Sequence, residues 1–396
     1  MKKKVISLMV ATVIMALGTF TANAFAATDE ESSGFEGAKS AVMTSLQNAE
    51  SVSAPSDEYL ILYTKTGNKL GYLLPLEENG SSSGYAVIIA KDGVYQTLTI
   101  SEGELSAETV SILKSKEMNG KIIYDFPFNF LVTEDNGKNM ILTENNALVA
   151  AEDLDAVMNA SEHSVDLDQY MSSLTMQKVQ PTADMEIARL RNWQKGSFVN
   201  VGAHYYGGYQ DWLHSKLSGS RQVTQFYADR ACGVAAANNV AIYLSQNMSG
   251  KANLYNRGTP LSVASCTENM RDIYDYITPA VWGIPTIDTL KSKFEEFAAA
   301  RGVSVTGHRS TDGWSKDTVL QYIGGGLIAD TPVLLLTWNT PVAELGTHWV
   351  TITRIYKESS LGANFMTTSN WGEMKTYNFD AWFDAGSIYQ GVIYFQ

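Results

Sequence analysis

Three side chains that lie far apart in the sequence have the types that nucleophilic catalysis requires. Cys232 directly precedes a run of small and aliphatic residues in RACGVAAANNVAIYL, which predicts a buried helix over 234–244. Unpaired backbone N–H groups at a helix N-terminus favour an anion, and the thiolate is the reactive form of cysteine. Cys232 is therefore a candidate nucleophile, although cysteines among small apolar residues are commonly structural.

A thiol nucleophile needs a base, and histidine is the usual one. The chain has five histidines. His163 falls in a polar segment, His204 and His214 lie in a loop-rich stretch before the cysteine, and His308 is in a stretch that looks exposed. The remaining candidate is His348, in GTHWVTITRIYKESSLGANFMTTSNWG.

The sequence around His348 predicts a β-hairpin. A strand over 349–356 would turn through KESSLG and return toward Asn370. A turn centred on Ser359 would set His348 opposite Asn370, with Cβ atoms about 4.5 to 5.5 Å apart. The amide oxygen of Asn370 could then accept from one imidazole nitrogen and leave the other for the thiol, with Trp371 lying over that bond. A slip of one residue would turn the two side chains to opposite faces, so the contact depends on register.

The blocks ACGVAAANNV, GTHWVTI and TSNWG follow one another in this order, and they resemble the Cys, His and Asn-Trp-Gly blocks of papain-like cysteine peptidases, particularly bacterial C39-like ones. The resemblance spans residues 200–396. It implies Cys232 as nucleophile, His348 as general base and then acid, and Asn370 as the group that orients the imidazole. It also implies a helical lobe packed against an antiparallel β-barrel lobe, with a peptide or protein substrate in the cleft between them.

The same resemblance implies an oxyanion hole formed by the backbone N–H of Cys232 and the amide of an upstream glutamine. Gln225 lies seven residues before the cysteine, slightly further than is usual in the family, and Gln222 and Gln210 are further back. Gln225 is the candidate catalytic donor. A solvent-exposed loop glutamine is the alternative interpretation.

Charge and composition divide the chain into parts. Residues 1–26, with three lysines, an apolar stretch and an Ala-Phe-Ala site, are typical of a secretory signal peptide, so we expect a secreted, extracellular protein. Residues 27–165 carry 22 acidic and 8 basic side chains and predict an acidic α+β N-terminal domain. A linker is expected over 166–195 and the papain-like domain over 196–396.

Local patterns support an α+β fold class in both halves. Asp92-Gly93 and Asp135-Asn136-Gly137 mark two hairpins, and a polar helix is expected over 104–116. In the C-terminal half, helices are expected early, over 267–276 and 286–301, and strands late. That order favours a two-lobed α+β domain over an alternating α/β sheet.

Several partners and cofactors are not expected. The net charge is −13, and no basic patch or glycine-rich phosphate loop occurs, so the sequence argues against nucleic-acid binding. Neither a membrane partner nor a cofactor is expected. The histidines are scattered and Cys232 and Cys266 are 34 residues apart, so no metal site is expected. A disulfide between these cysteines remains open, and Cys266 is most simply a core residue.

Two questions of function also remain open. The N-terminal domain is expected to be an inhibitory pro-domain that binds the catalytic cleft and is released by cleavage between residues 165 and 195; the alternative is a permanent adhesion or docking module. The whole protein could instead be an inactive surface-binding protein on a peptidase-like fold, or a transglutaminase-like or peptidoglycan amidase acyl-transfer enzyme. The Asn-Trp-Gly block favours the peptidase. The sequence predicts neither substrate preference nor oligomeric state.

Overall fold

The computed structural model describes most of the chain from residue 29 onward. The described residues are 29–125, 129–142, 146–150, 167–168, 171, 185–193, 205–214, 223–257, 261–280, 283–310, 315–338, 347–358, 362–384 and 388–396. The expected signal peptide, residues 1–26, lies outside them. Among the described helices, none is both long and apolar enough to span a membrane.

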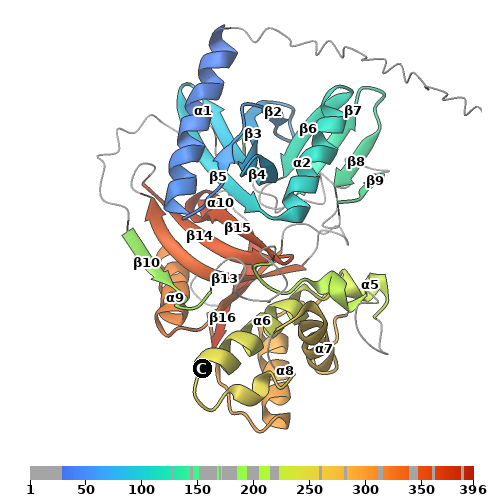
Figure 1. Cartoon of the computed structure of the whole chain (residues 1–396), viewed down its shortest axis with the longest axis vertical. Coiled ribbons are helices and arrows are strands. Elements are labelled where there is room, and N and C mark those ends of the chain that lie inside the picture. Colours follow the sequence, from blue (N-terminus) through green and yellow to red (C-terminus); the bar gives the residue numbers. More distant parts are fainter. Residues whose placement is uncertain are drawn as a thin grey trace, which may run out of the picture.

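The N-terminal unit, by which we mean the described residues from 29 to 171, is a sheet with one long helix on each face (Figure 1). Phe35, Val42 and Leu46 of the first helix pack on one face, and Val110 and Leu113 of the second pack on the other. Its elements are α1 (Asp29–Asn48), β1 (Ala54–Pro55), β2 (Leu60–Tyr63), β3 (Lys69–Glu78), β4 (Ser81–Lys91), β5 (Val94–Glu102), α2 (Glu104–Glu117), β6 (Gly120–Asp125), β7 (Asn129–Glu134), β8 (Asn139–Leu142) and β9 (Leu148–Ala150).

The local turn signals of this unit are confirmed. Asp92 and Gly93 adopt φ 50° and 76°, and Lys91 pairs with Val94 across them, as a two-residue hairpin turn requires. The second hairpin closes between β7 and β8, and α2 covers the helix expected over 104–116. The first helix, α1, is not anticipated by the sequence patterns.

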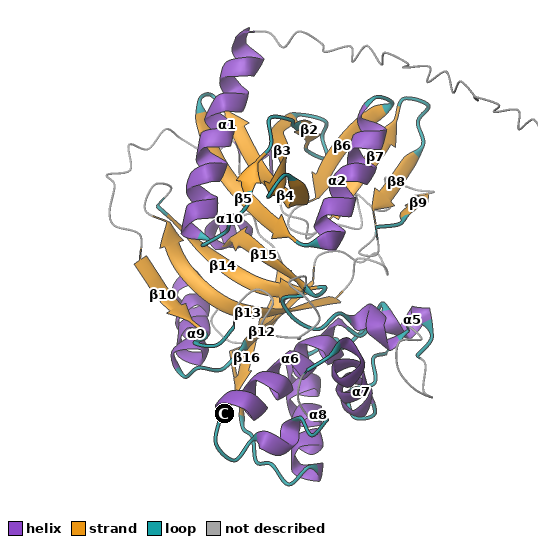
Figure 2. Ribbon diagram, in the orientation of Figure 1, coloured by secondary structure: helices purple, strands orange, loops and turns teal. Residues whose placement is uncertain are grey.

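In the C-terminal part most helices precede most strands, as expected, although a short strand, Met185–Arg189, comes before them and two helices lie among the late strands. Figure 2 shows α6, α7 and α8 grouped on the far side of the C-terminal strands from the N-terminal unit. The expected buried helix after Cys232 is α6. The elements are β10 (Met185–Arg189), η1 (Gln210–Leu213), α5 (Gln225–Ala228), α6 (Cys232–Asn247), η2 (Ala252–Leu254), α7 (Val263–Tyr274), α8 (Ile287–Ala300), β11 (Gly307–Ser310), α9 (Lys316–Ile328), β12 (Val333–Trp338), β13 (Thr347–Glu358), β14 (Ala363–Asn370), β15 (Glu373–Asn378), α10 (Phe379–Asp384) and β16 (Ile388–Phe395).

One mostly antiparallel sheet runs through both halves of the molecule. Its strand order is β11-β16-β12-β13-β14-β15-β5-β4-β3-β2-β6-β7-β8-β9. The two halves join where β15 pairs with β5, from Met374 opposite Glu102 to Tyr377 opposite Thr99. The chain is thus mixed α+β, and among the described strands the C-terminal sheet continues into the N-terminal unit instead of closing on itself.

The expected linker over 166–195 contains ordered contacts at both ends. Near its start, Asp168 accepts hydrogen bonds from Thr64, Thr66 and Asn68 of the N-terminal unit. Near its end, β10 pairs antiparallel with β13. The N-terminal unit therefore extends beyond residue 165, and the C-terminal sheet begins before residue 196.

Candidate active site

His348 and Asn370 form a buried hydrogen bond, His348 Nε2 to Asn370 Oδ1 at 2.8 Å. Asn370 Nδ2 donates in turn to the hydroxyl of Tyr377 at 3.0 Å. Because an amide oxygen can only accept, Nε2 is the imidazole nitrogen that carries the hydrogen in this bond. The lone pair is then on Nδ1, the nitrogen that can take a proton from a thiol. The expected contact between His348 and Asn370 is confirmed.

The register that was expected to produce this contact is wrong. The β13–β14 ladder runs from Glu358 opposite Ala363 to Thr351 opposite Ser369, with a bulge at Thr353. If the pairing of Thr351 with Ser369 is continued toward the start of β13, His348 and Asn370 are diagonal neighbours and not directly opposed residues. Diagonal side chains on one face remain within reach when they are long.

The bulge at Thr353 determines which face the two side chains share. Without the extra residue, the register that pairs Glu358 with Ala363 would continue along the whole hairpin. His348 and Asn370 would then point to opposite faces of the sheet. Buried contacts hold the bulge in place: the hydroxyl of Thr353 bonds Tyr206 Oη at 2.8 Å and the carbonyl of Thr367 at 3.2 Å.

The environment of His348 favours the neutral imidazole. The side chain is buried, and the ring of Trp371 lies 4.9 Å from it, centroid to centroid, at an interplanar angle of 42°. Burial lowers the pKa of His348 to about 4, and the Lys375 charge adds to this, although the Asn370 bond opposes it. The ring is therefore a base, not a cation, at neutral pH.

Cys232 is buried at the first residue of α6, as expected from the sequence. The start of this helix lies against the start of β13. A Cβ added at Gly233 would be 3.1 Å from Cδ1 of Trp349 and 2.4 Å from Cδ1 of Ile284, so there is no room for a side chain there. The residue after Cys232 thus contacts the residue after His348.

Asn239 connects α6 to both strands of the β13–β14 hairpin, a role that the sequence patterns did not predict. Its Nδ2 donates to the hydroxyls of Thr351 at 3.0 Å and Ser369 at 3.3 Å, and its Oδ1 accepts from the backbone N–H of Gly208 at 2.8 Å. It lies seven residues after Cys232, about two helical turns along the same helix face. A buried asparagine in an apolar helix was the available signal.

Gln225, the candidate oxyanion donor, is engaged with two carboxylates. It lies half-buried at the start of α5, and its Nε2 donates to Asp211 Oδ1 and Asp229 Oδ1, both at 2.6 Å. It would have to release one of these bonds to reach an oxyanion, so its catalytic role stays a prediction. Gln222 lies outside the described residues, and Gln210 is buried on η1.

Two of the remaining histidines lie among the described residues. His214 Nδ1 contacts the carbonyl of Val223 at 3.1 Å, and His308 stacks on Tyr394 with ring centroids 5.1 Å apart. His163 and His204 lie outside the described residues. Among the residues that the structure places, no group of His, Cys, Asp and Glu could hold a metal ion.

Cys266 occupies a structural position. Its sulfur is fully buried and accepts a hydrogen bond from Asn238 Nδ2 at 3.1 Å, and burial raises the pKa of this thiol to about 12. Neither Cys232 nor Cys266 forms a disulfide. The expectation that Cys266 is a core residue is confirmed.

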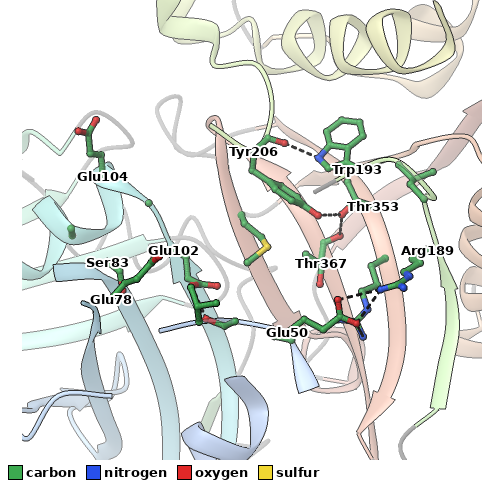
Figure 3. Close-up of a pocket in the computed structure, with 18 of the residues that line it drawn as sticks. Glu50, Glu78, Ser83, Glu102, Glu104, Arg189, Trp193, Tyr206, Thr353 and Thr367 are labelled. Atoms are coloured by element: carbon green, nitrogen blue, oxygen red, sulfur yellow. Dashed lines mark hydrogen bonds and ion pairs between the residues drawn. The ribbon is translucent and has the colours of Figure 1, made fainter. Parts of the chain in front are cut away.

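A cavity of about 940 Å³ lies between the N-terminal unit and the C-terminal strands (Figure 3). In it, Glu50 points toward Arg189, and an oxygen of the carboxylate lies 3.0 Å from the guanidinium. Trp193 Nε1 donates to the carbonyl of Tyr206 at 2.8 Å. The described lining includes none of the candidate catalytic residues, which are Cys232, His348, Asn370 and Gln225, so this cavity is separate from them.

No family model matches the chain, and a comparison with curated proteins found no significantly similar one. The resemblance to papain-like peptidases thus depends on the three sequence blocks.

Proposed function

We propose that this chain is a secreted cysteine peptidase that hydrolyses peptide bonds through Cys232, His348 and Asn370. The observation that carries the proposal is the 2.8 Å bond between His348 and Asn370, because it orients the imidazole with Nδ1 as the proton acceptor. Support comes from the helix that presents Cys232, since its second residue, Gly233, lies against Trp349, the residue after His348 on β13.

In the proposed mechanism, His348 Nδ1 takes the thiol proton of Cys232 and the sulfur attacks the carbonyl carbon of a peptide bond. The imidazolium then gives its proton to the leaving amine as the C–N bond breaks, and an acyl-enzyme thioester remains. A water molecule, deprotonated by the same imidazole, attacks the thioester and releases the acid and the thiol. The backbone N–H of Cys232 and an upstream glutamine, with Gln225 as the candidate, would stabilise the oxyanion.

The proposal includes the two-lobed papain-like arrangement. The helices α6, α7 and α8 would be the helical lobe, and the strands β12 to β16 would form the other, with the substrate between them. It also includes export and synthesis as a precursor that is cut between residues 165 and 195. N-terminal sequencing of protein from culture medium tests the cut: a start within this segment is expected, and recovery of the full-length form alone would contradict it.

A thiol-directed epoxide tests the chemistry directly. We expect stoichiometric labelling of Cys232 in the wild type, no labelling in Cys232→Ser, and loss of labelling in His348→Ala. A peptide-library digest should show cleavage by the wild type alone. Equal labelling of the wild type and His348→Ala would instead favour an inactive binding protein, and transfer of the acyl group to an added amine in place of hydrolysis would favour an acyl-transfer enzyme.

A further inference from the structure

We propose that the N-terminal unit is a permanent part of the active site, where it positions the turn bearing Asn370 and Trp371 through the contact of Ser106 with Glu373. The unit stays bound after a cut in the connecting segment, residues 172–184. This inference rests on the proposed function, and it replaces the expectation of a released inhibitor. Ser106 and Glu373 are positioning residues in this proposal, since they act through the turn.

The turn between β14 and β15 has a conformation that its own sequence does not favour. Asn370 pairs with Glu373, and the two residues between them, Trp371 and Gly372, adopt φ 51° and 77°. Glycine takes such values freely, but for a bulky residue like tryptophan they are unfavourable and persist only where surrounding contacts impose them. The turn that holds Trp371 over His348 therefore needs support from outside the hairpin.

The N-terminal unit supplies that support at Glu373. The Glu373 carboxylate accepts from the backbone N–H of Ser106 at 3.1 Å and from its hydroxyl at 2.5 Å. These groups lie in the first turn of α2, where the helix dipole favours a negative charge. Gly103 makes room for the contact, because a Cβ there would be 2.3 Å from an oxygen of Glu373.

Glu373 is joined to the candidate triad by a short series of contacts. It is buried and lies 4.0 Å from the Lys375 ammonium, which is 4.7 Å from the centre of the Trp371 ring. Trp371 in turn packs on His348. Loss of the Ser106 contact would leave the buried Glu373 carboxylate with fewer hydrogen-bond donors. Because this carboxylate is linked to Trp371 through Lys375, we expect the turn to shift.

Asn370 is also supported through strand pairing. Its hydrogen-bond partner Tyr377 is buried and pairs with Thr99 of β5, whose hydroxyl is 2.7 Å from that of Tyr124. Without the N-terminal unit, β15 would be an open edge with unpaired backbone groups. The amide that orients His348 therefore depends on a strand from the other half of the chain.

These contacts would survive a cut in the connecting segment. None of the residues that make them lies between 172 and 184, and the β5–β15 pairing is accompanied by a core of buried apolar residues that includes side chains from both halves. A cut there would break one peptide bond and leave the sheet joined.

The first test is a specific protease site inserted between residues 172 and 184. After cutting, we expect both fragments to elute together in size-exclusion chromatography and peptidase activity to be unchanged. Separation of the N-terminal fragment with a rise in activity would overturn the inference and restore the inhibitory pro-domain. Separation with loss of activity would overturn the claim that the unit stays bound.

The second test compares two matched serine variants. Ser106 and Ser45 are both buried, and each bonds a hydroxyl of β5 and a glutamate of the C-terminal part: Ser106 bonds Glu373, and Ser45 bonds Glu358 at 3.3 Å, toward the other end of the β13–β14 hairpin. We expect Ser106→Ala to lower kcat about tenfold with KM nearly unchanged, and to slow labelling of Cys232 in parallel. Ser45→Ala should lose comparable stability but keep kcat.

Glu373→Gln is the second variant for the same contact, and it should lower kcat in the same way with a Tm close to that of the wild type. Equal kcat in the wild type, Ser106→Ala and Glu373→Gln would contradict the inference while leaving the proposed function intact. A wild-type protein that neither labels at Cys232 nor cleaves peptides would contradict the proposed function itself.

Discussion

His348 and Asn370 lie 2.8 Å apart, Nε2 to Oδ1, although β13 and β14 do not pair them directly. The bulge at Thr353 brings both side chains to one face, and the diagonal offset leaves Asn370 to span the gap. Strand pairing therefore fixes the face, and the orientation of the amide depends on its second bond, to Tyr377.

Tyr377→Phe should lower the rate of catalysis without abolishing it. The change removes the acceptor of Asn370 Nδ2 and leaves a buried amide hydrogen without its partner, so a fall in kcat of about tenfold with little change in KM is expected. Steady-state peptide hydrolysis measures it. Tyr356→Phe, another buried tyrosine toward the far end of β13, is the control and should keep kcat. A similar fall in both variants would show a general packing effect instead.

The buried His348 should make the fold less stable in acid. Its pKa is about 4 in the folded chain and near 6.5 when unfolded, so between these values the unfolded chain binds more protons. The free energy of unfolding should thus fall as pH drops through this window, by about 3 kcal/mol from this group. Urea unfolding of the wild type and His348→Gln at several pH values isolates the contribution, since other groups are common to both. Parallel curves for the two proteins would refute it.

Local signals in the sequence predict local structure well. Asp92-Gly93 predicts its hairpin because both residues tolerate positive φ, and the apolar run after Cys232 predicts α6 because a buried helix needs apolar residues on most sides. The hairpin that brings His348 near Asn370 was predictable because its two strands are close in sequence, but the bulge at Thr353 that turns both side chains to one face was not.

Features that depend on distant residues were not predictable in the same way. Gly34 and Gly37 weaken the helical pattern of α1, and their presence is explained only by the rings of Tyr72 and Tyr95, which fill the space a side chain would need. The pairing of β5 with β15 joins segments more than 270 residues apart, and no periodicity within either strand specifies the partner. Nothing in the sequence around Ser106 or Glu373 specifies that these two residues are partners either.

The two cysteines should differ in reactivity. Cys266 is fully buried with a pKa raised to about 12, so it stays protonated and inaccessible in the folded state. Iodoacetamide should modify Cys232 alone in the native protein and both residues in denaturant, as peptide mass spectrometry would show. Cys266→Ala is expected to cost stability but to keep activity. Modification of Cys266 first, under native conditions, is the result that would rule this out.

Asn239→Ala should destabilise the fold more than an ordinary surface change, because the side chain serves three partners on β13, β14 and the Gly208 loop. A buried donor or acceptor that loses its partner costs about 1 to 3 kcal/mol. Because the three partners of Asn239 would lose only part of their hydrogen bonding, we expect the free energy of unfolding to fall by about 3 kcal/mol in total. Gln246→Ala, at the exposed end of the same helix, is the control and should cost less than about 1 kcal/mol. Urea denaturation measures both.

Asn239 also ties α6 to the strands that carry His348 and Asn370, so the loss of stability should be accompanied by slower labelling of Cys232. A destabilised variant that labels at the wild-type rate would show that this asparagine supports the fold alone.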